Sequence, residues 1–269
     1  MKVFDLFPFY NESKLLHLRV AELDPVVTDY GFSELPRTFT DLPKPMWLVF
    51  HWMKYQTGDH RFHNYQYAAI PSGPHPTVDW FQRRSLGSLL GSADPDDVVM
   101  LSDLDEIPNR DTVKHVIDCD YDYPVTLRMK LYYHRVDLLD PGPWLGTVIC
   151  RRKHLGTEPD MQQLREDRTH FPVIEDGGWH FSWLGDGKAI AEKLTAVDID
   201  RESAIYGSGG IQAPPSDPEF LQSCYEEGKD LFRRGRDKRQ IDILPGTFHP
   251  HEIEDWLKRF PQYMAPVLR

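Results

Sequence analysis

Apolar and polar positions follow two different periods at the start of the chain. Residues 2–7 form a short apolar run typical of a strand, which Pro8 ends. Residues 13–25 repeat apolar positions at helical spacing, with Ser13 as a candidate cap, and residues 26–32 form a second apolar run. A strand, a helix and a strand within about thirty residues predict a βαβ unit and therefore a parallel sheet.

The same alternation continues along the chain. We expect strands over residues 65–70, 98–101, 125–133 and 145–151, an extended run over 47–52, and helices over 79–90, 109–117 and 188–196. Loops rich in Pro or Gly cover residues 36–45, 71–76 and 207–218. No linker or repeat divides the chain. The pattern predicts a single α/β domain over residues 1–269, with a mostly parallel central sheet flanked by helices.

Composition excludes several classes of protein. The 269 residues carry a formal net charge of −11, which argues against a nucleic-acid partner bound through phosphate neutralisation. Three scattered cysteines predict neither a disulfide framework nor a zinc site. We find no signal peptide and no apolar stretch of about 18 residues that could span a membrane, so we expect a cytoplasmic protein.

The most informative stretch covers residues 97–108, where a buried strand over 98–101 leads into Asp103 and Asp105. In an extended chain, side chains two residues apart share a face, so the two carboxylates would point the same way and repel each other. A divalent cation such as Mn²⁺ or Mg²⁺ would relieve this repulsion. Four other pairs have the same spacing: Asp94/Asp96, Asp118/Asp120, Asp120/Asp122 and Asp198/Asp200. Solvated turns explain those four better, because no buried strand leads into three of them and the fourth follows a helical stretch.

A second stretch, residues 175–180, combines carboxylates, glycines and an aromatic side chain. Glu175 or Asp176 could act as a general base, the glycines would let the backbone approach a sugar, and Trp179 offers a flat face to that sugar. His180 could bind the metal. The alternative is that Trp179 and His180 are ordinary core residues. The basic run over 233–239 could clamp a pyrophosphate, although such runs are more often solvated surface.

Five short motifs occur in a fixed order along the chain. They are Phe7-Pro8-Phe9-Tyr10-Asn11-Glu12, Arg19 with Glu22-Leu23-Asp24, Thr38-Phe39-Thr40-Asp41-Leu42-Pro43-Lys44-Pro45, Ser102-Asp103-Leu104-Asp105-Glu106-Ile107-Pro108 and Gly178-Trp179-His180-Phe181-Ser182. In this order they resemble glycosyltransferase family 17, the family of the bisecting N-acetylglucosaminyltransferases. The resemblance implies a GT-A-like fold, UDP-N-acetylglucosamine as donor, a glycan acceptor, Mn²⁺ and an inverting β-1,4 transfer.

The resemblance also implies roles for individual residues. Asp103 and Asp105 match the family's metal and diphosphate motif, Asp176 stands where the base is expected, and Trp179 would meet the acceptor sugar. Candidate donor contacts are Phe7, Pro8, Asn11, Glu12, Arg83 and Asp103.

Two other functions remain open from the residues themselves. A haloacid-dehalogenase-type phosphatase also ends a buried strand in an Asp-x-Asp pair, but this chain has Glu106 where such enzymes continue with a small or hydroxyl residue. A non-enzymatic carbohydrate-binding protein would use tryptophans as sugar platforms and the acidic pair as a calcium site. The length and the βαβ opening argue against the second function.

Overall fold

The structure is a computed structural model that describes residues 1–40, 42–48, 62–66, 78–196, 217–243 and 248–265. Five sequence predictions therefore lie wholly or mostly outside the described residues. They are the extended run over 47–52, the strand over 65–70, the loop over 71–76, the loop over 207–218 and the acidic pair Asp198/Asp200.

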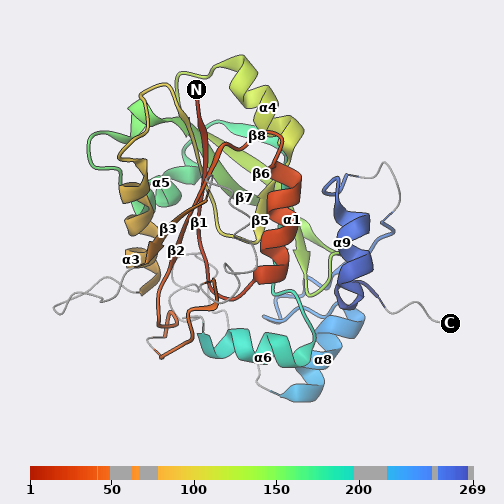
Figure 1. The fold of residues 1–269 in the computed structure, drawn as a ribbon. Helices are drawn as coiled ribbons and strands as arrows, with labels where there is room; N and C mark the ends of the chain where they lie inside the picture. The colour runs from red at the N-terminus through yellow and green to blue at the C-terminus, as the bar shows by residue number, and fades with distance from the viewer. Residues whose placement is uncertain (41, 49–61, 67–77, 197–216, 244–247, 266–269) are drawn as a thin grey trace. The chain divides into compact units, whose positions relative to one another are not determined.

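Four parallel strands form the first part of the sheet (Figure 1). In spatial order they are β3 (Phe62–Gln66), β2 (Asp29–Glu34), β1 (Val3–Pro8) and β4 (Val98–Leu101). Helix α1 (Ser13–Leu23) connects β1 to β2, so the predicted βαβ unit is confirmed. All four residues of β4 are buried, as its run of apolar side chains predicts.

The remaining strands make the sheet mixed. Strand β7 (Leu138–Arg151) pairs antiparallel with β4 and with β9 (Arg239–Gln240). Next to β7 come β6 (Val125–Tyr133), β8 (Val173–Ser182) and β5 (Glu106–Pro108), which gives the order β3-β2-β1-β4-β7-β6-β8-β5 for the described part of the chain. The α/β class is confirmed. The expected parallel arrangement holds from β3 to β4, and the antiparallel pairs of β7 limit it to that part.

Ser13, the expected cap, is instead the first residue of α1, whose N-cap is Glu12 without a side-chain cap bond, and one further element has other bounds than expected. Helix α4 (Arg110–Cys119) begins after Asn109, whose side chain accepts a hydrogen bond from the Asp111 N–H at 2.9 Å. The helix expected over 79–90 is α3 (Val78–Ser85), continued by the 3-10 turn η1 (Leu86–Leu90). The other helical elements are η2 (Arg152–Leu155), α5 (Met161–Glu166), η3 (Asp167–Thr169), α6 (Gly187–Ala196), α8 (Pro218–Glu227), α9 (Ile253–Arg259) and η4 (Pro261–Tyr263).

The chain forms two compact units. The first contains Met1–Met129 and Leu145–Gly178, and the second contains Lys130–Trp144 and Trp179–Arg269. Strands β6, β7 and β8 therefore each contribute residues to both units. The expectation of a single domain over residues 1–269 stays a prediction.

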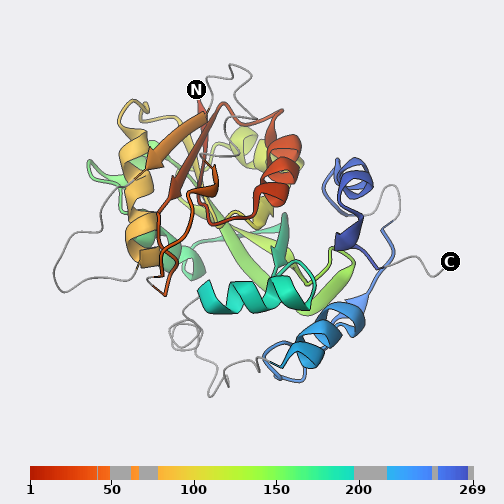
Figure 2. The same ribbon diagram turned by 60° about the horizontal axis from the view of Figure 1, so that its bottom comes forward.

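In the first unit, helices cover both faces of the sheet. Figures 1 and 2 show α1 and α4 on one side of β1 and β4, and α3 and α5 on the other. The core on the α3 and α5 side contains Phe4, Leu6, Leu86, Leu90, Val99, Leu101, Val148, Cys150, Met161 and Leu164. Because β1 and β4 are parallel neighbours, their carboxyl ends meet at the same edge of the sheet.

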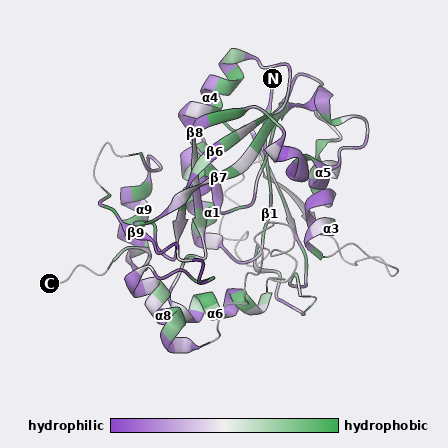
Figure 3. Ribbon diagram, turned by 180° about the vertical axis from the view of Figure 1, so that it is seen from behind, coloured by the Kyte–Doolittle hydropathy of each residue, from purple (hydrophilic) through white to green (hydrophobic). Residues whose placement is uncertain are grey.

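In the second unit, α6 and α8 lie side by side (Figure 2). Figure 3 shows hydrophobic and hydrophilic residues mixed along both helices, as expected for helices with one buried face. The core of this unit contains Leu131, Tyr133, Trp183, Ile190, Leu221, Cys224, Leu231 and Phe232.

A buried histidine makes the stability of the second unit depend on pH. His134 is completely buried, and burial together with the charge of Lys238 lowers its pKa to about 3. The unfolded chain binds a proton near pH 6.5 whereas the folded chain does not, so stability falls as the pH falls from 6.5 towards 3. His134 has a φ of 66°, a conformation that Asn tolerates.

We therefore expect wild type to lose about 2 kcal/mol more unfolding free energy between pH 7 and pH 5 than His134→Asn. Urea unfolding at the two pH values measures this difference. His170→Asn is the control, because the His170 side chain is 78% exposed. Equal pH dependence of wild type and His134→Asn would contradict the assignment.

Candidate functional site

The acidic pair lies in a turn at the carboxyl edge of the sheet. Strand β4 ends at Leu101, and the N–H of Glu106 donates to the carbonyl of Asp103 at 3.1 Å. This bond closes a turn over residues 103–106, which we name the acidic turn. The expectation that the chain continues extended through Asp103 and Asp105 is therefore wrong, and the shared-face argument does not apply. Leu104 is buried, which fixes the acidic turn to the core.

Two arginines bind the carboxylate of Asp103. The Arg83 guanidinium donates to one oxygen at 2.9 Å and the Arg165 guanidinium to the other at 2.9 Å. Both arginine side chains are almost buried, whereas Asp103 keeps 31% of its side chain exposed. Charge-assisted bonds of this kind are strong and directional. Arginines thus supply positive charge that the sequence analysis assigned to a metal ion alone.

Arg165 also binds the buried carboxylate of Glu106. Its two terminal nitrogens donate to the two Glu106 oxygens at 2.9 and 2.6 Å, in the bidentate geometry that favours arginine. Glu106 in turn accepts a hydrogen bond from the N–H of Asp103 at 3.0 Å. The side chain of Glu106 and the backbone of Asp103 therefore hold the acidic turn together.

The sequence analysis missed Arg165. It lies on the six-residue helix α5, whose first turn is capped by Asp160 through hydrogen bonds from Gln162 N–H and Gln163 N–H at 3.1 Å each. The Asp160 cap is a sequence signal for the helix. No local signal identifies Arg165 as a partner of Glu106, because the two residues are 59 positions apart.

A third arginine contacts the backbone of the acidic turn from within the core. Arg19 on α1 is completely buried and donates to both carboxylate oxygens of Asp5 at 2.8 and 2.5 Å. It also donates to the hydroxyl of Ser102 at 2.6 Å. Its remaining contacts are the carbonyls of Asp103 at 3.1 Å, Leu104 at 3.2 Å and Glu106 at 2.7 Å.

The predicted nucleotide contacts Pro8, Asn11 and Glu12 lie at the end of β1 or just after it. The N–H of Ser102 donates to the carbonyl of Leu6 at 3.2 Å, so the ends of β1 and β4 are adjacent. Pro8 and Glu12 are partly exposed and Asn11 is exposed. Phe7 differs from the other three.

Phe7 is completely buried, and its ring lies against Phe32 and under the Arg19 guanidinium. The structure therefore brings Pro8, Asn11, Glu12, Asp103 and Arg83 to one edge of the sheet and places the Phe7 side chain in the core beneath it.

Hydrogen bonds of Lys44 and Glu34 connect the loops that follow β1 and β2. The Lys44 ammonium donates to the buried carboxylate of Glu34 at 2.9 Å and to the carbonyl of Tyr10 at 3.3 Å. Glu34 also accepts from the N–H groups of Trp47 and Leu48 at 2.7 and 2.9 Å. Burial raises the pKa of Glu34 against the opposing effect of Lys44, and burial lowers the pKa of Lys44. These hydrogen bonds therefore order the loop that contains Tyr10.

The predicted bases Glu175 and Asp176 are exposed on β8. Glu175 pairs with Arg128 at 3.0 Å, an exposed pair that contributes little to stability. The carbonyl of Asp176 accepts from the Thr112 hydroxyl at 2.8 Å, near the start of α4. Strand β5 separates that position from the acidic turn. The structure therefore places Asp176 at the end of β5 opposite Asp103 and Asp105.

The two glycines that follow Asp176 allow close packing of strands. A Cβ at Gly177 would lie 2.5 Å from the Cβ of Leu127. A Cβ at Gly178 would lie 2.8 Å from the backbone nitrogen of Asn109, and Gly178 has a φ of 136°. The carbonyl of Gly177 accepts from the Asn109 N–H at 3.0 Å. Packing of β8 against β5 and β6 thus explains both glycines without a sugar.

Trp179 and His180 are buried in the second unit. The indole nitrogen of Trp179 donates to the carbonyl of Phe248 at 3.0 Å, and only 1% of Trp179 is exposed. The His180 ring lies 4.5 Å from the ring of Trp144. These contacts favour the alternative that Trp179 and His180 are core residues, and their roles toward a sugar and a metal stay predictions.

The basic run over 233–239 is largely neutralised by buried acids of the second unit. Lys238 is buried and donates to Asp140 at 2.7 Å, and Arg236 binds the other oxygen of Asp140 at 2.6 Å. Arg234 binds Asp230 at 2.8 Å. These pairs give the run a structural role, and they leave it poorly suited to clamp a pyrophosphate.

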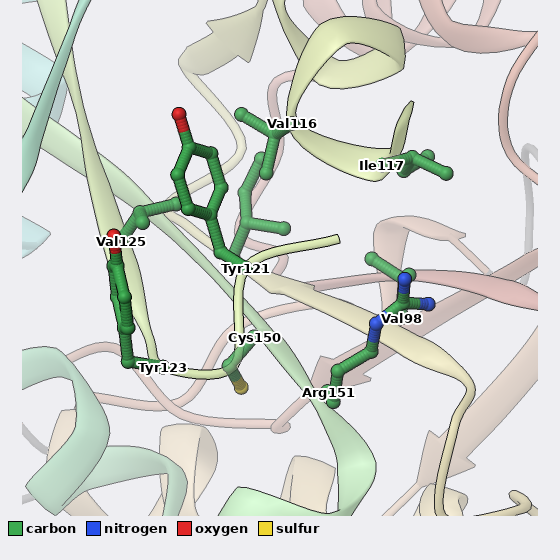
Figure 4. A pocket seen from close by; sticks show the side chains of 9 residues that line it. Val98, Val116, Ile117, Tyr121, Tyr123, Val125, Cys150 and Arg151 are labelled. Atoms are coloured by element: carbon green, nitrogen blue, oxygen red, sulfur yellow. The ribbon is translucent and has the colours of Figure 1, made fainter. Parts of the chain in front are cut away.

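One apolar pocket of the first unit lies away from the acidic turn (Figure 4). Its lining includes Val98, Val116, Ile117, Tyr121, Tyr123, Val125, Ile149, Cys150 and Arg151. Val98 is the first residue of β4, whereas the acidic turn follows its last residue. The pocket is therefore at the opposite edge of the sheet and is separate from the candidate site.

The carboxylate oxygens that the acidic turn offers as metal ligands suit one kind of metal ion. Within the described ranges, no three His, Cys, Asp or Glu side chains are grouped so that they could hold a metal. Carboxylate oxygens in a pair suit Mg²⁺ or Mn²⁺, which commonly take one or two protein carboxylates and complete their coordination with phosphate and water. The residues thus fit a cation that arrives with a phosphorylated ligand.

In open α/β sheets, ligands bind outside the carboxyl ends of the strands, so the edge that carries the acidic turn is the candidate site of an α/β enzyme. The chain matches the family model of glycosyltransferase family 17 over residues 1–198. It therefore belongs to glycosyltransferase family 17, and the protein is a transferase. A search of curated proteins found no match.

Several solved structures show remote likeness. The bifunctional IspDF from Campylobacter jejuni is 12% identical, with 74% of this chain and 55% of that chain covered and a TM-score of 0.35. A putative nucleotide-diphospho-sugar transferase from Desulfovibrio desulfuricans G20 is 8% identical, with 78% and 92% covered and a TM-score of 0.37. The mannosyltransferase PcManGT from Pyrobaculum calidifontis, in complex with GDP-Man and Mn²⁺, is 12% identical, with 83% and 69% covered and a TM-score of 0.41.

In the part of the chain that the structure describes, no helix has the length and apolar character needed to cross a membrane.

The close approach at Gly178 is testable. We expect Gly178→Ala to destabilise the protein by about 3 kcal/mol, because the methyl group meets the backbone of β5 and the φ is unfavourable. Gly91→Ala is the control, since Gly91 has right-handed helical backbone angles and the nearest atom to its Cβ position, the Ser88 carbonyl oxygen, is 3.7 Å away. It should change the stability by less than about 1 kcal/mol in urea unfolding. Unchanged stability of Gly178→Ala, with a loss confined to sugar binding, would restore the sugar-contact role.

Proposed function

We propose that the protein transfers N-acetylglucosamine from UDP-N-acetylglucosamine to a hydroxyl group of a glycan acceptor. The linkage implied by the family resemblance is an inverting β-1,4 bond formed on a GT-A-like fold. Membership of glycosyltransferase family 17 supports the reaction class. The observation that carries the site is the acidic turn at the end of β4, where two arginines bind Asp103.

Asp105 and Asp103 are the residues that would hold the metal ion, with the donor diphosphate and water completing its coordination. Bound there, Mn²⁺ or Mg²⁺ would offset the negative charge that develops on the departing nucleoside diphosphate. Asp103 is fixed by Arg83 and Arg165, so its carboxylate is oriented before a ligand binds. Asp105 is buried in the same turn as Asp103, and its carboxylate would be the second oxygen ligand of the metal ion.

Arg83 and Arg165 neutralise carboxylates of the acidic turn, so the metal ion would offset the charge of the donor. Their two positive charges face Asp103 and the buried Glu106, so the four side chains are neutral together. The candidate donor contacts Pro8, Asn11 and Glu12 lie at the same edge and could reach the uridine or ribose. Phe7 would support these residues from below, because its ring is buried.

The general base remains the least constrained part of the mechanism. A base must lie within hydrogen-bond reach of the acceptor hydroxyl, directly or through one water. Asp176 is exposed and Glu175 lies beside it. Both residues are near the end of β5 that is far from the acidic turn. We retain Asp176 as the proposed base, with Glu175 as its neighbour, whereas the contacts of Trp179 and His180 favour a role in the core of the second unit.

The two alternative functions receive less support. A phosphatase and a carbohydrate-binding protein both explain an Asp-x-Asp pair, but neither explains the match over residues 1–198 to a glycosyltransferase family. The acceptor and a cytoplasmic location also stay predictions.

The metal role of Asp105 leads to a direct test. Asp105→Ala should abolish Mn²⁺-dependent cleavage and transfer of UDP-N-acetylglucosamine, with a loss of at least about 100-fold. Release of UDP with and without Mn²⁺ measures this loss, and circular dichroism checks that the fold is intact. Asp122→Ala is the matched control, because Asp122 belongs to another Asp-x-Asp pair and its side chain is 77% exposed. Full activity of Asp105→Ala would refute the assignment.

The base proposal has its own test. Asp176→Asn should leave UDP binding unchanged and reduce transfer by about 100-fold or more, because the amide cannot accept the proton of the hydroxyl group. Asparagine tolerates the φ of 51° found at this position, so the fold is preserved. Glu175→Gln, measured in parallel, separates the two carboxylates. If Asp176→Asn retains transfer and Glu175→Gln loses it, the neighbouring carboxylate is the base. If both retain it, the base lies elsewhere.

A further inference from the structure

Arg19 uses its whole guanidinium group inside the protein. Nε and Nη2 bind the two oxygens of Asp5, and Nη2 also binds the Ser102 hydroxyl. Nη1 converges on three backbone carbonyls of the acidic turn, those of Asp103, Leu104 and Glu106. No part of the Arg19 or Asp5 side chain is exposed.

Stability alone is a weak reason for such a pair. Removal of two charges from water is costly, and apolar residues of similar volume often replace a buried ion pair without loss of stability. The Arg19–Asp5 pair instead meets a specific need of the backbone. Carbonyl groups of a buried turn cannot bond to water, and each requires a donor. One planar guanidinium provides that donor for the carbonyls of Leu104 and Glu106, and a second donor for the Asp103 carbonyl, which also accepts from the Glu106 N–H.

The acidic turn is thereby held from two sides. Its carbonyls face Arg19, while the carboxylates of Asp103 and Glu106 bind Arg165. The carbonyl and the carboxylate of Asp103 thus have different arginine partners. This arrangement fixes the backbone from which the side chains of Asp103 and Asp105 project, before any ligand binds.

We propose that Arg19 is a positioning residue for the transferase, which sets the geometry of Asp103 and Asp105 toward a divalent cation and a nucleoside diphosphate. This inference rests on the proposed function. Partners that orient metal ligands through a second contact typically change metal affinity by about 10- to 100-fold when they are altered. Arg19 acts one step further back, through the backbone, and never touches the ligand itself.

The test replaces Arg19 with Lys, which keeps the charge toward Asp5 but lacks the planar fork that reaches three carbonyls. We expect a folded protein whose Kd for Mn²⁺ in the presence of UDP is weakened by at least about 10-fold. Electron paramagnetic resonance of free Mn²⁺ measures this constant without turnover. The KM for UDP-N-acetylglucosamine should rise, and kcat should fall with it.

Arg135→Lys is the matched control. Arg135 is also buried, binds Asp137 at 3.0 Å and donates to the carbonyls of Tyr225 and Glu226, but it lies in the second unit. A general loss of stability would lower the melting temperature of both variants and leave both Kd values unchanged. A selective loss of Mn²⁺ affinity in Arg19→Lys supports the positioning role.

A second variant covers the case in which Arg19→Lys fails to fold. The double variant Asp5→Leu with Arg19→Met replaces the ion pair with apolar side chains, so no buried charge is left alone. We expect it to fold and to show the same weakened Kd. If wild type and the folded Arg19 variants bind Mn²⁺ and UDP equally well, the positioning role is refuted while the transferase stands. If wild type binds neither Mn²⁺ nor UDP, the proposed function itself fails.

Discussion

The ion pair between Arg19 and Asp5 is the constraint on which the candidate site depends. It joins the first strand and the first helix to the acidic turn, which lies 84 to 87 positions after Arg19. Both side chains are fully buried, so loss of either partner would leave an isolated charge in the core. The acidic turn is therefore coupled to the βαβ unit at the start of the chain, and its shape is set when that unit packs.

The charged side chains around the acidic turn pair with one another. Asp103 and Glu106 carry two negative charges, and Arg83 and Arg165 carry two positive charges that neutralise them. Repulsion between acidic neighbours is therefore relieved within the protein before any cation binds. Such preorganised charges do not have to rearrange when a charged ligand arrives, which is the general basis of electrostatic catalysis. A cation recruited together with a diphosphate agrees with this balance better than a permanent metal centre does.

Local signals in the sequence predicted the elements that carry the site. The buried strand β4, the helix α1 and the cap at Asn109 follow from apolar spacing and from side-chain chemistry near the position itself. The conformation of residues 103–106 did not follow, because Arg19 determines it through carbonyls 84 to 87 positions away. Arg165 was missed for the same reason. Contacts between residues that are far apart in the sequence determine the turn and the role of Arg165, and the spacing of residues does not indicate these contacts.

The segment over 175–180 shows how a single motif can serve several parts of a structure. Its neighbouring acids, glycines and aromatic residues suggest one sugar site when read in the sequence. In the structure, Gly177 and Gly178 allow β8 to pack, Trp179 is buried with Phe248, and the acids remain exposed near Thr112. Since β5 separates these acids from Asp103 and Asp105, a base at Asp176 requires the anomeric carbon of the donor, and the hydroxyl that attacks it, to lie at that end of the strand. The location of the base therefore depends on how the donor sugar extends from the acidic turn, and a sugar that stays close to the turn would require a base closer to Asp103 and Asp105.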